Sequence, residues 1–150
     1  MRHFGIVVMY VSFMLTFILG MTDLGAEKML SKTLAINRYD TVAYFTKGKA
    51  LPGNQQYLSQ WNGLIWYFSN KEHKDLFDNN PEKYAPQYNG YCAWAMAESR
   101  KAETDPEVWK IVNGKLYLNC SEAAFESWSK DIPGNIKKAD KNWLKFSANQ

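Results

Sequence analysis

Two Asn-Gly pairs, each set between two strand-like segments, constrain the fold of this chain more than any other feature. The first, Asn62-Gly63, separates residues 55–60 from residues 64–68, and the second, Asn113-Gly114, separates residues 108–112 from 115–118. Both central residues of a type I′ turn need a positive φ, which asparagine and glycine adopt readily. The sequence therefore predicts two β-hairpins.

A helix start follows each hairpin. Residues 69–72 have the pattern of a capping box and open a helix through Phe77, which Asn80-Pro81 ends. Ser121 caps a second helix that carries Ala124, Phe125 and Trp128. The two turns stand 51 positions apart, so the chain shows the same hairpin-and-helix plan twice. Two copies with little residue identity do not establish a repeat architecture, and reuse of a stable unit explains them.

Two further helices complete the expected fold. Asp40 is a plausible N-cap of a short helix that Gly48 ends. After a break at residues 132–134, residues 135–146 predict a last helix with Ile136, Ala139, Trp143 and Phe146 on one face. We expect a small single α+β domain with two β-hairpin-plus-helix units and a C-terminal helix.

The first 26 residues have the pattern of a secretory signal peptide. Residues 4–20 are almost wholly apolar, and Leu24-Gly25-Ala26 ends in a small residue. The apolar run is near the lower limit for a membrane span, so an uncleaved anchor is the alternative. We expect residues 27–36 to form a flexible segment, 37–146 the domain and 147–150 a tail, in an exported protein that is periplasmic or secreted and contacts a membrane only through an uncleaved N-terminal segment.

Cys92 is the best functional lead. It follows a turn signal, Asn89-Gly90, where a short helical segment begins at Tyr91. The unsatisfied N–H groups of a helix N-terminus stabilise a thiolate, so the thiol could be reactive or bind a metal. The alternative is packing, because free cysteine is among the most buried residue types.

Counting ligands limits the kind of metal site. Without the signal segment the chain keeps one histidine, His73, and two cysteines, Cys92 and Cys120, which excludes a Cys₄ or Cys₂His₂ zinc site within one molecule. A soft ion such as Cu(I) could be held by Cys92 with Met96, four residues on along the same helical face, or with Cys120. Core packing is the alternative role for Met96. We expect His73 to be a surface residue of its helix.

Enzymatic and nucleic-acid functions find less support. The sequence has no Cys-x-x-Cys pair, no Gly-rich phosphate loop, no Ser-based elbow and no His-Glu-x-x-His motif. Its formal net charge is +3 and its basic residues are scattered, which does not indicate a nucleic-acid partner. We expect a binding or redox-accessory module more than an enzyme.

Several motifs resemble exported YHS domain-containing proteins. They are found in the expected order at residues 39–45, 61–63, 67–69, 80–93 and 113–119. In that family the position of Cys92 holds a cysteine, and in some members a selenocysteine, which implies more than packing. The wider group of YHS domains accompanies metal-transporting ATPases and some oxygenases. The resemblance therefore implies metal or redox chemistry, and a metal-handling or redox protein as partner.

One departure from the family bears on the cysteines. Cys120 stands where an aromatic residue is usual, and a Cys92–Cys120 disulfide would close a loop of about 28 residues, worth about 3 kcal/mol. A fold shared with members that have an aromatic residue there cannot depend on this bridge.

Three hypotheses follow for Cys92. The first is a soft-metal site, copper-like, in a pocket with Asp40, Tyr84, Tyr88 and Tyr91 and with help from Met96. The second is one-cysteine peroxide or disulfide chemistry, in which Cys92 passes through a sulfenic acid. The third is a non-catalytic protein-interaction domain with a buried structural cysteine.

Overall fold

The computed structural model describes residues 34–148. The predicted signal peptide or anchor, residues 1–26, lies outside the described residues, as do residues 27–33 and the last two of the chain. Between residues 34 and 148, no helix is long and apolar enough to span a bilayer.

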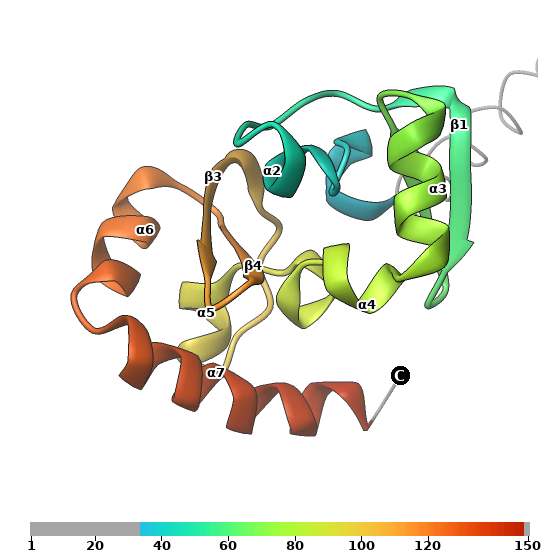
Figure 1. Cartoon of the computed structure of the whole chain (residues 1–150). Helices are drawn as coiled ribbons and strands as arrows, with labels where there is room; N and C mark the ends of the chain where they lie inside the picture. Colours follow the sequence, from blue (N-terminus) through green and yellow to red (C-terminus); the bar gives the residue numbers. More distant parts are fainter. Residues whose placement is uncertain (1–33, 149–150) are drawn as a thin grey trace, which may run out of the picture. The chain divides into compact units, whose positions relative to one another are not determined.

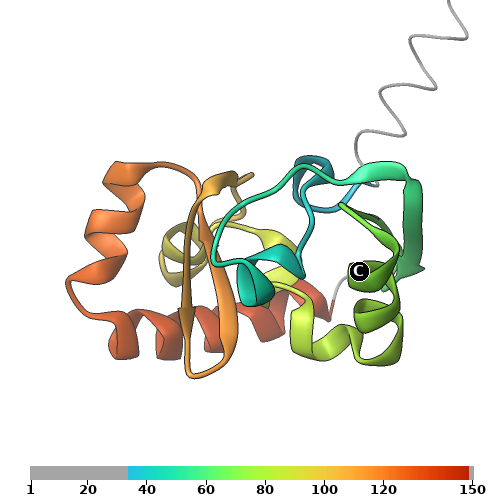
Figure 2. The ribbon, with the colours of Figure 1, turned by 45° about the horizontal axis from the view of Figure 1, so that its top comes forward.

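The described residues form an α+β domain built from two successive halves, which confirms the expected fold class (Figures 1 and 2). The first half contains η1 (Ala35–Arg38), α2 (Ala43–Thr46), β1 (Asn54–Trp61), β2 (Leu64–Phe68), α3 (Lys71–Asn79) and α4 (Pro81–Tyr84). The second contains η2 (Gln87–Gly90), α5 (Ala93–Ala97), β3 (Asp105–Val112), β4 (Lys115–Asn119), α6 (Glu122–Ser129) and α7 (Ile132–Ser147).

Both predicted hairpins are confirmed. Asn62 and Gly63 have φ values of 51° and 73°, and Asn113 and Gly114 have 51° and 75°. Positive φ at both central residues is the signature of the type I′ turn. Each hairpin is a separate two-stranded antiparallel sheet. Because an isolated two-stranded hairpin is marginal in water, each depends on the helices packed against it.

Of the two helices that follow the hairpins, one has the predicted N-cap and the other has a different one. Ser121 accepts a hydrogen bond from the Ala124 amide at 3.2 Å, as expected. In α3 the cap is Asn70, which accepts from the His73 amide at 2.8 Å. The capping box predicted from Ser69 is wrong, because the Ser69 hydroxyl donates instead to the buried Asp40.

The last helix begins at Ile132, three residues earlier than predicted. Asp131 caps it by accepting from the Gly134 amide at 3.0 Å. Pro133 falls in the first turn, where its missing N–H has no helical partner to lose. The predicted apolar face is confirmed, since its four residues all pack in the second core cluster.

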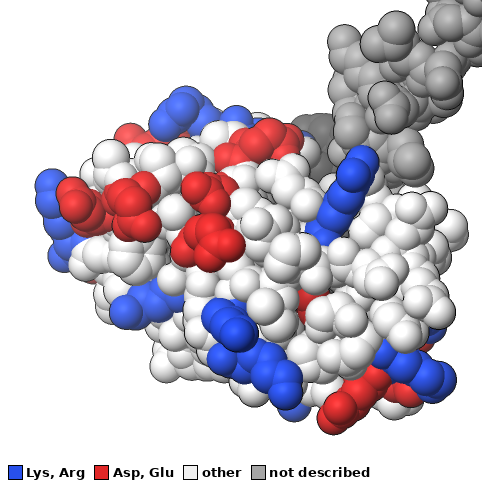
Figure 3. Space-filling view, turned by 90° about the horizontal axis from the view of Figure 1, so that it is seen from above, with Lys and Arg blue, Asp and Glu red and all other residues white. Residues whose placement is uncertain are grey.

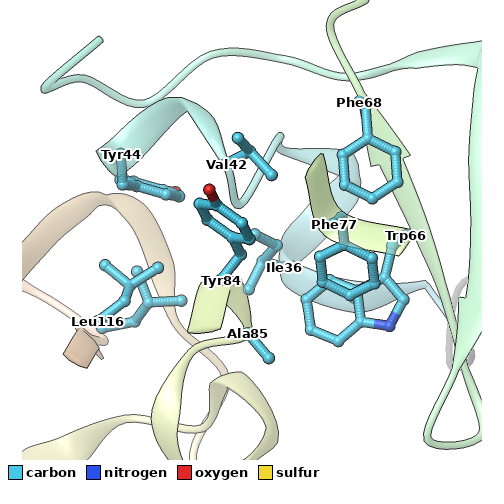
Figure 4. Packing of buried hydrophobic residues seen from close by; sticks show 11 residues of the cluster. Ile36, Val42, Tyr44, Trp66, Phe68, Phe77, Tyr84, Ala85 and Leu116 are labelled. Carbon is cyan, nitrogen blue, oxygen red and sulfur yellow. The ribbon is translucent and has the colours of Figure 1, made fainter. Parts of the chain in front are cut away.

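Two aromatic clusters form most of the core. In the first, the Phe77 ring lies 5.1 Å from the rings of both Trp66 and Phe68 (Figure 4). In the second, the Trp128 ring lies 5.5 Å from that of Tyr117. These separations are those of favourable aromatic pairs, so large rings fill much of this small core.

The domain begins earlier than residue 37. Leu34 forms a parallel bridge with Ile65, and Ala35 and Ile36 are buried in the first cluster. These three residues belong to the domain and not to the expected flexible segment, because their apolar side chains cover the β1–β2 hairpin and its cluster.

Candidate functional site

Cys92 lies at the junction of η2 and α5. Its side chain is 0 % exposed and caps α5, and its Sγ accepts a hydrogen bond from the Ala95 amide at 3.5 Å. A left-handed turn precedes this position, with φ of 59° at Tyr88 and 53° at Asn89. The structure thus places the thiol at a helix N-terminus, as the sequence predicts.

Cys120 brings a second thiol to the site. It directly follows β4, is exposed, and its main-chain amide donates to Cys92 Sγ at 3.2 Å. The two side chains also interact, because the Cys120 thiol contributes to a raised pKa of Cys92. Both cysteines are free, so the structure has a pair of thiols here, one buried and one at the surface.

Burial decides the protonation of Cys92. Removal from water raises the pKa of its thiol from 9.0 to about 11, and the Ala95 and Cys120 amides act in the opposite direction. The buried sulfur is therefore a protonated thiol at neutral pH.

Asn119 forms the polar wall of the site. Its Oδ1 accepts from the Trp94 amide at 3.1 Å and lies 3.7 Å from Cys92 Sγ, which donates to it. The Asn119 side chain is 0 % exposed, and its Nδ2 has no hydrogen-bond partner among the described residues. A buried donor left unsatisfied beside the sulfur suits a site that takes up a further polar group.

The residues predicted to surround Cys92 do not gather around its sulfur. Tyr84 and Asp40 lie in the first half, whereas Tyr88 and Tyr91 pack near the Trp143 ring of α7. Met96 is buried in the second aromatic cluster. The side chains that pack with Cys92 are Trp94, Ala95, Ala102 and Ala124. The side chains around Cys92 are thus mostly small, and none of the predicted pocket residues is among them.

Asp40 belongs to a separate buried cluster with His73. Its Oδ2 lies 2.6 Å from His73 Nδ1 and accepts from the Ser69 hydroxyl at 2.6 Å, while its Oδ1 accepts from the Val42 amide at 2.9 Å. The Asp40 carboxylate thus bonds the turn that precedes α2. The predicted N-cap at Asp40 is wrong, because α2 begins at Ala43 and its cap is Val42. The expectation of a surface His73 is wrong, since this residue is 2 % exposed. It precedes Phe77 by one helical turn on the buried face of α3, a spacing that could have revealed it.

The two clusters hold equivalent places in the two halves of the chain. Ser69 donates its amide to Asp40 at 2.8 Å, and Cys120, 51 positions later, donates its amide to Cys92. Each acceptor also accepts from a main-chain amide that follows it, that of Val42 for Asp40 and that of Ala95 for Cys92. The sulfur of Cys92 therefore occupies a main-chain cradle that holds a carboxylate in the first half.

Residues 42–88 match the family model of the YHS domain. The chain is a YHS domain-containing protein. The match spans α2 to Tyr88 and ends four residues before Cys92, so the two thiols lie outside the matched segment of the YHS domain. No curated protein and no solved structure matches the chain.

The side chains of the described residues limit the kind of metal site. Within the part of the chain that the structure describes, no group of three or more His, Cys, Asp or Glu residues could hold a metal ion. Two thiols, by contrast, supply the soft ligands that Cu(I) selects. On the face shown in Figure 3, basic side chains form small separate groups among acidic and uncharged surface.

Proposed function

We propose that this YHS domain-containing protein binds a soft metal ion of the Cu(I) type through the thiolates of Cys92 and Cys120. One observation carries the proposal: the residue that donates its amide to Cys92 Sγ is itself a cysteine, with a solvent-exposed side chain. One short segment thereby supplies both a second soft ligand and a hydrogen bond to the first. The metal association typical of YHS domains supports the same reading.

The raised pKa of Cys92 is compatible with metal binding. Burial disfavours the free thiolate because its charge is uncompensated, whereas a bound cation compensates that charge and replaces the proton. The amides of Ala95 and Cys120 would remain as donors to the bound sulfur, the kind of outer contact that orients and tunes metal ligands. Bound metal would make the domain a carrier of the ion.

The exposure of Cys120 determines from which side an ion can reach the site. Its sulfur faces solvent while that of Cys92 is enclosed, so an incoming ion or an accepting protein meets Cys120 first. We infer a metal-handling partner that exchanges the ion by ligand substitution at this thiol. Export to the periplasm or out of the cell, which the N-terminal sequence predicts, would place this exchange outside the cytoplasm.

Protein docking with a structural cysteine is the second candidate, and the complete burial of Cys92 favours it. Peroxide chemistry by Cys92 alone finds less support, because the attacking species is the thiolate and burial raises the pKa of this thiol to about 11.

A Cu(I) competition titration against a chromogenic chelator, under reducing conditions, tests the proposal. We expect one equivalent to bind the wild type. Cys92→Ala and Cys120→Ala should each lose more than about 100-fold in affinity, because each removes one of the two ligands, which costs more than loss of an outer contact. Met96→Leu is the control and should bind like the wild type. Equal affinity in wild type and Cys92→Ala would overturn the metal site and leave docking as the function.

A further inference from the structure

A second cluster of polar side chains, separate from the two cysteines, has the geometry of a hydroxyl-activating relay. We propose that Asp40, His73 and Thr46 act as such a relay and make Thr46 a nucleophile toward activated acyl esters. The Thr46 Oγ1 lies 3.0 Å from His73 Nε2, and His73 Nδ1 lies 2.6 Å from Asp40 Oδ2. A carboxylate, an imidazole and a hydroxyl joined in this order are the arrangement by which acyl-transfer enzymes activate an alcohol.

The surroundings of Asp40 fix the tautomer of His73. The carboxylate accepts from the Ser69 amide and hydroxyl at 2.8 and 2.6 Å and from the Val42 amide at 2.9 Å. An acceptor with these donors around it requires a proton on the facing nitrogen of His73, which is Nδ1. In the neutral imidazole, Nε2 is then left as an acceptor for the proton of the Thr46 hydroxyl. The Val42 carbonyl oxygen, 3.1 Å from Thr46 Oγ1, is the other acceptor within reach of this single proton.

Enclosure holds the relay rigid while its outer end meets solvent. Asp40 and His73 are 0 % and 2 % exposed, and the Asn70 cap at the start of α3 fixes the turn that carries the imidazole. Thr46, the last residue of α2, is exposed, as are the neighbouring Lys47 and Lys49. These lysines directly follow Thr46 along the chain, and positive charge favours the negative oxygen that develops on an attacked carbonyl.

The reaction balances without a further reagent except water. Thr46 Oγ1 forms a bond to the acyl carbon as its proton passes to His73 Nε2, and the bond from that carbon to the leaving oxygen then breaks. The leaving oxygen takes the proton from Nε2, which releases an alcohol and leaves an ester on Thr46. Water hydrolyses this ester through the same relay and restores the hydroxyl. No group is oxidised or reduced.

The test uses p-nitrophenyl acetate as the acyl donor and follows acetylation by peptide mapping. Hydroxylamine distinguishes an ester on Thr46 from acetyl groups on lysines, because it removes only the ester. Ser129, an exposed hydroxyl at the end of α6, is the internal reference, and Ser129→Ala should react at Thr46 like the wild type. We expect Thr46 to be acetylated roughly 100-fold faster than Ser129, a modest contribution for a positioned general base.

Variants test whether Thr46 reacts because the relay activates its hydroxyl or only because it is exposed. Thr46→Val should remove the hydroxylamine-labile acetyl group and Thr46→Ser should keep it; both changes are at an exposed position that the fold tolerates. His73→Gln, checked for folding by near-UV circular dichroism, should slow Thr46 to the rate of Ser129. Acetylation of Thr46 no faster than that of Ser129 in the wild type would overturn the relay. An unchanged rate in a folded His73→Gln protein would overturn it equally.

Discussion

At the scale of single residues, the sequence predicted the location of the important thiol better than its environment. Asn89-Gly90 and the following apolar run place Cys92 at a helix N-terminus, and the structure confirms that position. Its neighbour Cys120 stands 28 positions later and meets it only because β4 ends beside α5. Local patterns carry no information on such a contact, which is why the sequence left Met96, one helical turn away, and Cys120 as alternative partners of Cys92.

The enclosed thiol predicts how stability depends on pH. Burial raises the pKa of Cys92 from 9.0 to about 11, so the folded protein keeps this proton where the unfolded chain releases it. The stabilisation is complete below pH 9 and is lost as the pH rises toward 11. Between pH 8 and 11 we expect the wild type to lose about 2 kcal/mol more of its free energy of unfolding than Cys92→Ala does. Urea unfolding of both proteins under reducing conditions measures this difference, and parallel pH profiles would contradict it.

At the scale of elements, signals that span a few residues were sufficient for most of the fold. The Asn-Gly turns predicted both hairpins, and Ser121 was identified as a cap from its own sequence neighbourhood. The predictions were wrong where a side chain forms a hydrogen bond with a residue that is distant in the sequence. Ser69 was expected to cap α3, but it bonds Asp40, 29 positions earlier, and Asn70 caps the helix instead.

Two serines at the two ends of α6 test how much an N-cap contributes to the free energy of unfolding. Ser121→Ala removes the acceptor of the Ala124 amide and should lower the free energy of unfolding by about 1 kcal/mol. Ser129→Ala changes an exposed hydroxyl at the other end of α6 and should alter it by less than about 0.5 kcal/mol. Chemical denaturation compares the two variants; equal losses would show that the Ser121 hydroxyl does not act as a cap.

At the scale of the whole molecule, the doubled plan explains why two polar clusters exist. Asp40 with Ser69 and Cys92 with Cys120 occupy the same places in successive halves, and only the first half adds a histidine. The sequence shows the 51-residue spacing of the turns, but the equivalence of a carboxylate and a thiol is visible only from their shared amide contacts. Residue identity between the halves is too low to reveal it.

The aromatic rings packed around Phe77 stabilise the first half of the domain. Phe77 is 1 % exposed and contacts the rings of Trp61, Trp66 and Phe68. Phe77→Ala should lower the free energy of unfolding by about 3 to 5 kcal/mol, because it removes buried apolar surface and leaves a cavity. Leu144→Ala, at a side chain 70 % exposed on α7, should change it by less than about 0.5 kcal/mol. Thermal and urea unfolding measure both, and a mild effect of Phe77→Ala would contradict this account of the core.

Copper K-edge X-ray absorption of the stoichiometric Cu(I) complex tests the central claim, a two-thiolate site, most directly. The account predicts two sulfur ligands and no nitrogen ligand in the wild type, with at least one sulfur lost in Cys92→Ala and in Cys120→Ala, and with Met96→Leu unchanged. A nitrogen ligand from His73, or a sulfur count that neither cysteine variant alters, would contradict it.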